Sequence, residues 1–127
     1  KSQDFQINII KMTGDIEINN LIKNELKFYS NRSSNNKYDI SINSKYQKII
    51  VSKNSAGVAT DYKISVYTKI SINLNNKNNI LNFSENINIK SNSNSFEQNN
   101  YERNIKKNFA SSIKNKFIIK IFNLDDN

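Results

Sequence analysis

Strict alternation between core-type and polar side chains runs from Tyr62 to Leu74, and it constrains the fold more than any other feature of the sequence. Successive side chains of an extended strand point to opposite faces of a sheet, so this pattern predicts one long strand with a core face and a solvated face. The core face carries Tyr62, Ile64, Val66, Thr68, Ile70, Ile72 and Leu74. The solvated face carries Lys63, Ser65, Tyr67, Lys69, Ser71 and Asn73.

The turn sequence at residues 54–57 predicts a hairpin between this strand and the one before it. In the earlier strand, apolar residues alternate with polar ones over residues 38–42, and further along the apolar face passes to Ile49 and Val51. We therefore expect a bulge or a bend in residues 44–48.

A second hairpin is predicted at residues 75–79, where four asparagines surround a lysine. The strand that follows alternates apolar and polar residues over residues 81–89, but Glu85 falls on its apolar side. This strand is therefore expected to bulge at Glu85 or to lie at an edge of the sheet.

The N-terminal part of the chain predicts a short strand followed by a helix. Apolar residues alternate over residues 4–12, which is typical of a half-buried strand. Asp15 is a suitable N-cap, and the apolar residues after it recur at helical spacing, so residues 16–30 are predicted to form an amphipathic helix.

The C-terminal part predicts a long helix, capped by Ser95 or one of its neighbours. Apolar residues recur every four positions and form one stripe along about six turns. The stripe consists of Tyr101, Ile105, Phe109, Ile113, Phe117 and Ile121, flanked by Ala110 and Ile118. Such a stripe is typical of a helix that covers a sheet.

The predicted order is therefore β-α-β-β-β-α. This order favours the α+β class, as a two-layer sandwich in which a four-stranded mixed sheet carries two helices on one face. A length of 127 residues suits one domain, so we expect residues 1–127 to form a single unit.

Histidine, cysteine, proline and tryptophan are absent from the sequence. Their absence excludes a disulfide framework, a His-dependent catalytic triad and the usual zinc sites. The carboxylates are scattered, and the two glycines are too few for a phosphate-binding loop. We therefore expect a binding or assembly protein, with no catalytic residues, no metal site and no cofactor.

The formal net charge of +8 points to an anionic partner. Residues 45–90 contribute +5 of this charge, from seven lysines against Asp61 and Glu85. Lys63 and Lys69 share the solvated face of the predicted central strand with Tyr67, and Lys45 and Lys53 share one parity on the neighbouring strand. Together these five residues form a candidate anion-binding platform.

The element order resembles that of the lipopolysaccharide-assembly lipoprotein family LptE. The resemblance spans nearly the whole chain and includes Ala59-Thr60-Asp61-Tyr62 at the start of the third strand, the run from Tyr62 to Leu74, and Phe109-Ala110-Ser111-Ser112-Ile113 in the last helix. It implies a lipoprotein on the periplasmic face of the outer membrane, anchored through an N-terminal cysteine that would precede Lys1. Its implied partners are a large LptD-like β-barrel translocon, which it would plug, and lipopolysaccharide.

The same resemblance bears on individual residues. The family has a basic residue at the end of its second strand that is tied to lipopolysaccharide binding, and Lys53 stands at the matching position. A second basic residue of the family falls on residues 92–95, which carry no charge here, although Lys90 lies nearby.

Two other functions remain open at the level of sequence. The basic face with its tyrosine is also typical of a nucleic-acid-binding module, in which bases stack on an aromatic ring. A generic periplasmic protein-interaction module that docks a partner without an anionic ligand is the other alternative. The LptE-like interpretation expects no nucleic acid as a partner.

Overall fold

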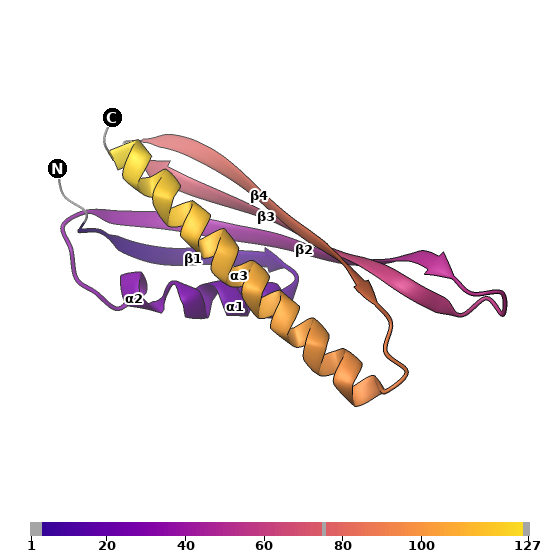
Figure 1. Ribbon diagram of the computed structural model, residues 1–127. Coiled ribbons are helices and arrows are strands. Elements are labelled where there is room, and N and C mark those ends of the chain that lie inside the picture. The colour runs from indigo at the N-terminus through magenta and orange to yellow at the C-terminus, as the bar shows by residue number, and fades with distance from the viewer. Residues whose placement is uncertain (1–3, 75, 126–127) are drawn as a thin grey trace.

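The structure, a computed structural model, describes residues 4–74 and 76–125 (Figure 1). Four strands form one sheet, in the spatial order β1 (Gln6–Gly14), β2 (Lys37–Lys53), β3 (Ala59–Leu74) and β4 (Lys77–Lys90). β1 runs parallel to β2, whereas β2, β3 and β4 are antiparallel neighbours, so the sheet is mixed. The helices are α1 (Ile16–Glu25), α2 (Lys27–Ser30) and α3 (Ser95–Asp125).

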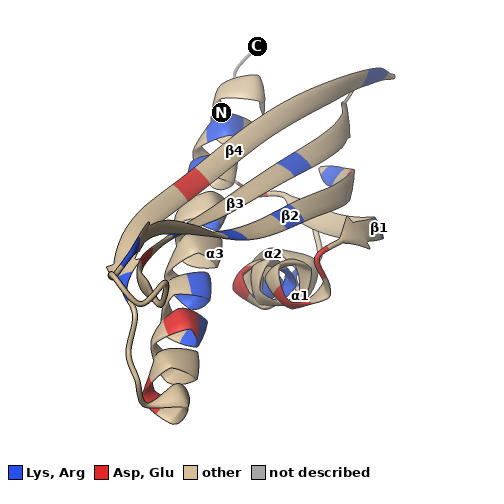
Figure 2. Cartoon of the chain, turned by 90° about the vertical axis from the view of Figure 1, so that its right-hand side faces the viewer, with Lys and Arg blue, Asp and Glu red and all other residues tan. Residues whose placement is uncertain are grey.

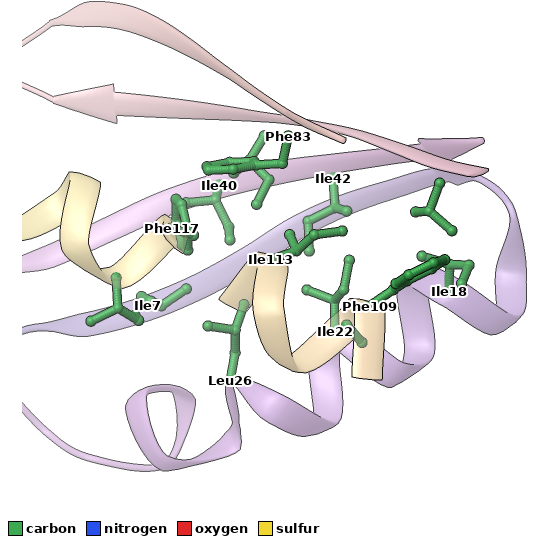
Figure 3. Close-up of a cluster of buried hydrophobic side chains, with 14 of the residues drawn as sticks. Ile7, Ile18, Ile22, Leu26, Ile40, Ile42, Phe83, Phe109, Ile113 and Phe117 are labelled. Atoms are coloured by element: carbon green, nitrogen blue, oxygen red, sulfur yellow. The ribbon is translucent and has the colours of Figure 1, made fainter. Parts of the chain in front are cut away.

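The helices lie on one face of the sheet and leave the other face open (Figure 2). This arrangement confirms the α+β two-layer sandwich. α3 runs diagonally across the sheet and packs beside α1 (Figure 1). The core lies between the two layers, where Ile22 of α1 and Ile113 of α3 lie beneath Ile42 of β2 (Figure 3). Phe109 of α3 lies beside Ile18, and Phe117 lies toward Ile40.

The junction between β1 and α1 depends on Gly14 and Asp15. The strand extends from Gln6 to Gly14, later than the predicted residues 4–12, because its parallel pairing with β2 continues to Ser44. Asp15 N then donates to Ser44 O at 2.8 Å, and the Asp15 carboxylate accepts from Ile18 N at 2.9 Å, which confirms the predicted N-cap.

The helix predicted over residues 16–30 is interrupted at Leu26. This buried residue has φ −89° and ψ 1°, in the bridge region, so the chain leaves the α-helix there before the short α2. The break allows Tyr29 to stack on Phe5, with ring centroids 4.9 Å apart. One amphipathic stripe is thus divided between two helices.

The bulge predicted in residues 44–48 is wrong. Pairing of β2 with β3 is regular from Asp39 to Ile50, and the register shifts on either side of Ser52 instead. Ile49 and Val51 do not join the core: both are exposed, Ile49 lies opposite Lys63 on the open face, and the β2–β3 hairpin extends beyond the helices (Figure 1).

β4 lies at an edge of the sheet, which confirms one of the two alternatives raised by Glu85. Its pairing with β3 shows no bulge, and Val66 lies opposite Glu85. The carboxylate is accommodated on the helix side because it accepts hydrogen bonds from Ser112 Oγ, at 3.0 Å, and from Lys116 Nζ. The β3–β4 turn is shorter than predicted, with β3 ending at Leu74 and β4 beginning at Lys77; Asn75 lies outside the described residues.

The predicted apolar stripe of α3 is buried from Ile105 to Ile121, but Tyr101 is 47% exposed. Its place toward the start of the helix is taken by Gln98, which is buried, and by Glu102, which binds β2 residues. α3 extends beyond the core at its N-terminal end, so the first turn of the stripe, at Tyr101, is left exposed. The Asn94 side chain caps the helix by accepting from Glu97 N at 3.1 Å.

Candidate anion-binding face of the sheet

The open face of the sheet brings together three of the five predicted site residues. The β2–β3 register places Lys45 directly opposite Tyr67 and Asn43 opposite Lys69. On the other side of β3, Tyr67 lies opposite Ser84 and Lys69 opposite Asn82. Side chains directly opposite on one face of antiparallel strands lie within contact distance. Lys45, Tyr67 and Lys69 therefore form one group.

This group lines a shallow depression of about 420 Å³ on the sheet. Its lining residues are Asn43, Lys45, Tyr67, Thr68, Lys69, Asn82, Phe83 and Ser84. Tyr67 is 47% exposed, so its ring is available to a ligand. Two ammonium groups, two amides and one aromatic ring thus border the same space.

A second, smaller depression adds Lys11, which the sequence analysis missed. It measures about 220 Å³, shares Lys69 and Asn43 with the first, and is lined on the β1 side by Lys11 and Thr13. The alternation of residues 4–12 places Lys11 on the core side of β1. A register shift between Ile9 and Lys11 turns it to the open face, opposite Ser41. Nothing in the alternation itself marks that shift.

The other two predicted residues lie apart from the depression. Lys63 is exposed on the same face, opposite Ile49, four residues from Tyr67 and therefore roughly 13 Å away along the strand. Lys53 lies opposite Ala59, a further four residues along β3 and roughly another 13 Å away. The predicted platform is therefore a row along the sheet and its hairpin, with one compact group.

Ion pairs distinguish the two sides of the sandwich. On the helix side, four lysines are paired with acids, as Lys48–Glu102, Lys106–Glu17, Lys114–Glu25 and Lys116–Glu85. On the open face, no ion pair joins Lys11, Lys45, Lys63 or Lys69 to any acid within residues 4–74 and 76–125. Figure 2 shows basic positions spread over the strands. The open face therefore carries uncompensated positive charge.

Among the described residues, Asp39 and Asp61 lie on the open face, and both have partners. Asp39 lies beside β1 and accepts from Asn8 Nδ2 at 3.1 Å. Asp61 accepts from the Thr60 hydroxyl at 2.9 Å and from Lys90 Nζ at 3.3 Å. The Thr60 hydroxyl, together with Lys90, lowers the pKa of Asp61, which therefore stays ionised and paired. Neither acid lines the depression around Tyr67.

This arrangement suits a polar ligand that carries several negative charges. Lysine ammonium groups bind phosphates as hydrated point charges, and the amides of Asn43 and Asn82 can donate to or accept from hydroxyl groups. Among the described residues, no group of three or more His, Cys, Asp or Glu side chains is placed to hold a metal ion. No helix in the described part of the chain has the length and apolar character needed to span a bilayer.

Comparison with known sequences finds no matching family model and no matching curated protein. Comparison with solved structures finds lipoproteins. Rare lipoprotein B of Shewanella oneidensis superposes with a TM-score of 0.65 at 12% identity, over 93% of this chain and 99% of that one. A Caulobacter crescentus protein described as a lipoprotein has a TM-score of 0.60 at 9% identity, over 93% and 87% of the two chains.

A minor lipoprotein of Acinetobacter baumannii has a TM-score of 0.56 at 10% identity, over 87% of this chain and 91% of that one. Identities this low bear on fold and not on activity. Each match nevertheless covers most of both chains, so the likeness extends through the sandwich and is not confined to one hairpin. The chain therefore has the fold of these bacterial lipoproteins.

Proposed function

We propose that this protein is a non-enzymatic outer-membrane lipoprotein that takes part in lipopolysaccharide assembly and binds lipopolysaccharide on the open face of its sheet. The observation that carries the proposal is the row of lysines without acidic partners beside the Tyr67 depression. The fold match to lipoproteins supports the same class, because the LptE resemblance implies a lipoprotein of this architecture.

The charge distribution explains why the open face is the better binding surface. On the helix side, Lys48, Lys106, Lys114 and Lys116 are already paired with carboxylates, so an anionic ligand would have to displace those pairs. Lys45 and Lys69 have no such competitor, and lipid A phosphates carry the multiple negative charges that they would attract. Asn43 and Asn82 supply hydrogen bonds for the sugar hydroxyls between phosphates.

The proposal includes a large LptD-like β-barrel as the partner that encloses the sandwich. The interior of an outer-membrane barrel is polar. The open face is rich in Lys, Asn, Ser and Thr and therefore suits such a wall. Affinity purification of the tagged protein from detergent-solubilised outer membranes would recover a large barrel in equal amount. Recovery of no barrel would contradict this part of the proposal.

A charge-reversal pair tests the binding surface. The double variant Lys45→Glu, Lys69→Glu is expected to weaken binding to purified lipopolysaccharide by roughly tenfold or more at low salt, because attraction becomes repulsion. The matched control is Lys107→Glu, Lys120→Glu, which makes the same change in net charge at exposed positions of α3. Surface plasmon resonance with immobilised lipopolysaccharide measures both.

Equal loss of affinity in the two double variants would contradict the site, since net charge alone would then explain binding. Single-stranded RNA in the same assay separates the rival function, and tighter binding of RNA than of lipopolysaccharide would overturn the proposal. Lys53→Glu is measured separately because the resemblance implies a role for Lys53 although it lies outside the depression. The thermal midpoint of this variant should not change, since Lys53 is exposed.

A further inference from the structure

The β2–β3 hairpin carries a concentration of exposed apolar side chains. Ile49, Ile50, Val51 and Val58 are each between 46% and 59% exposed, and they lie within ten residues of one another. The hairpin projects beyond the helices (Figure 1). Its last pair, Lys53–Ala59, also lies beyond both outer strands, because β1 pairs with β2 only as far as Ser44 and β4 pairs with β3 only as far as Asp61.

The apolar residues occupy both faces of this end of the sheet, where β1 has ended and β2, β3 and β4 remain. Ile50 lies opposite Tyr62 on the helix side, and Ile49 lies opposite Lys63 on the open side. Both side chains stay about half exposed, so neither face buries them at this end of the sheet. Clustered exposed apolar side chains of this kind mark interaction surfaces.

The end of the hairpin is well defined. Asn54 Oδ1 accepts from Ala56 N at 2.9 Å and from Val58 N at 3.0 Å, and Asn54 N donates to Val58 O at 2.9 Å. Gly57 adopts φ +84°, which a tight turn requires. These bonds hold Val58 at the tip in a fixed position, so it is displayed outward by structured backbone.

The unpaired charges beside the exposed apolar residues of the hairpin are positive. Lys53 and Lys63 are exposed and, within the described part of the chain, are not engaged by a carboxylate, whereas Asp61 is held by Thr60 and Lys90. Residues 52–58 include no acid. A hairpin end that combines exposed apolar side chains with unpaired lysines complements the boundary of a bilayer in which acyl chains lie beneath anionic headgroups.

We propose that the tip of the β2–β3 hairpin inserts into the headgroup region of an anionic phospholipid bilayer. Val51 and Val58 enter the acyl boundary, and Lys53 and Lys63 contact lipid phosphates. This surface is distinct from the Tyr67 depression and needs no lipopolysaccharide.

The absence of tryptophan gives a direct test, since one introduced indole reports its own surroundings. Val58→Trp is compared with Ile119→Trp, a similarly exposed position near the C-terminal end of α3, which lies far from the hairpin (Figure 1). The vesicles for this experiment are made of phosphatidylglycerol mixed with phosphatidylcholine and contain no lipopolysaccharide. Val58→Trp should show a blue shift and quenching by brominated acyl chains, and Ile119→Trp should show neither.

The contribution of charge is measured in the Val58→Trp background. Lys53→Glu should reduce partitioning by roughly thirtyfold at low salt, because one attractive charge becomes repulsive at the lipid surface. Lys120→Glu, near the C-terminal end of α3 and far from the hairpin, should reduce partitioning by less than roughly threefold. Lys45→Glu, Lys69→Glu should leave the indole shift in place, which separates this proposal from lipopolysaccharide binding.

Three outcomes would overturn the proposal. The first is the same emission with and without vesicles. The second is an equal shift with pure phosphatidylcholine or in Ile119→Trp, which would show that the introduced indole itself drives binding. The third is a blue shift without vesicles that grows with protein concentration, which would identify a second copy of the chain as the occupant.

Discussion

Gly14 combines two requirements that exclude every other residue. Its φ is +87°, and a Cβ at this position would lie 2.1 Å from the carbonyl oxygen of Ser44. That oxygen also accepts from Asp15 N, so it cannot move away without loss of the first hydrogen bond beyond the strand. Gly57 has a similar φ of +84° but open space around it. A comparison of substitutions at the two glycines therefore distinguishes the cost of a positive φ from the cost of steric overlap.

Gly14→Ala is expected to destabilise the protein by about 3 kcal/mol or more, because the clash adds to the strain of a positive φ. Gly57→Ala should cost only about 1 kcal/mol, from the strain alone. Urea denaturation followed by circular dichroism measures both values. Equal losses would show that the close approach to Ser44 relaxes without cost.

Glu102 links α3 to β2 through charged hydrogen bonds. It accepts from Lys48 Nζ at 2.7 Å, from Gln98 Nε2 at 2.6 Å and from the Tyr46 hydroxyl at 3.4 Å. Burial alone would raise the pKa of Glu102, but these hydrogen bonds outweigh burial and lower it. Burial and the nearby Glu102 charge raise the pKa of Tyr46, which keeps the phenol protonated.

Because the folded-state pKa of Glu102 lies below its unfolded value, the stabilisation is complete above the unfolded pKa and is lost as the pH falls through the folded pKa. Glu102→Gln should therefore flatten the acid side of the stability profile below about pH 4.5, the ordinary value for a glutamate. Urea midpoints measured across this range provide the test. Glu97→Gln, at an exposed position of the same helix, is the control, and parallel profiles for wild type and Glu102→Gln would refute the assignment.

At the scale of elements, α3 is divided lengthwise into a buried and an exposed side. Ile113 is fully buried against α1 and the sheet, whereas Ile119 is 59% exposed. Ile113→Ala should cost about 2 to 5 kcal/mol, because it removes buried methyl groups and leaves a cavity. Ile119→Ala should change the free energy of unfolding by less than about 0.5 kcal/mol. Thermal and urea denaturation of the pair would measure the difference, and similar losses would place α3 differently on the sheet.

The sequence predicts elements well where one periodicity extends over many residues. The alternation of β3 and the stripe of α3 each repeat often enough to fix both type and buried face. Prediction fails where an element outruns its neighbours, because local pattern does not reveal how far the opposite layer extends. Ile50 and Tyr101 are exposed for this reason, whereas Ile49 is exposed because the register places it on the open face. Lys11 was missed because a single register shift reverses the face of every residue after it.

At the scale of the whole molecule, the two faces of the sheet differ mainly in whether their lysines are paired with acidic side chains. Lys48, Lys106, Lys114 and Lys116 on the helix side have acidic partners, whereas Lys11, Lys45, Lys63 and Lys69 on the open face have none among the described residues. Lys45, Tyr67 and Lys69 were predicted together since alternation assigns them one side of the sheet, and the register brings them into one group. The separation of Lys53 and Lys63 from that group could not be predicted, since strand parity specifies a face but not a distance.

The position of α3 also bears on the order in which the chain folds. The β2–β3 and β3–β4 hairpins join residues that are close in sequence, so they can form before distant parts of the chain meet. Contact between α3 and α1 joins segments at opposite ends of the chain, as the Lys106–Glu17 pair illustrates. The apolar face of the meander therefore stays uncovered until the last residues are available. A chain that lacks α3 would expose that face and would be prone to aggregate.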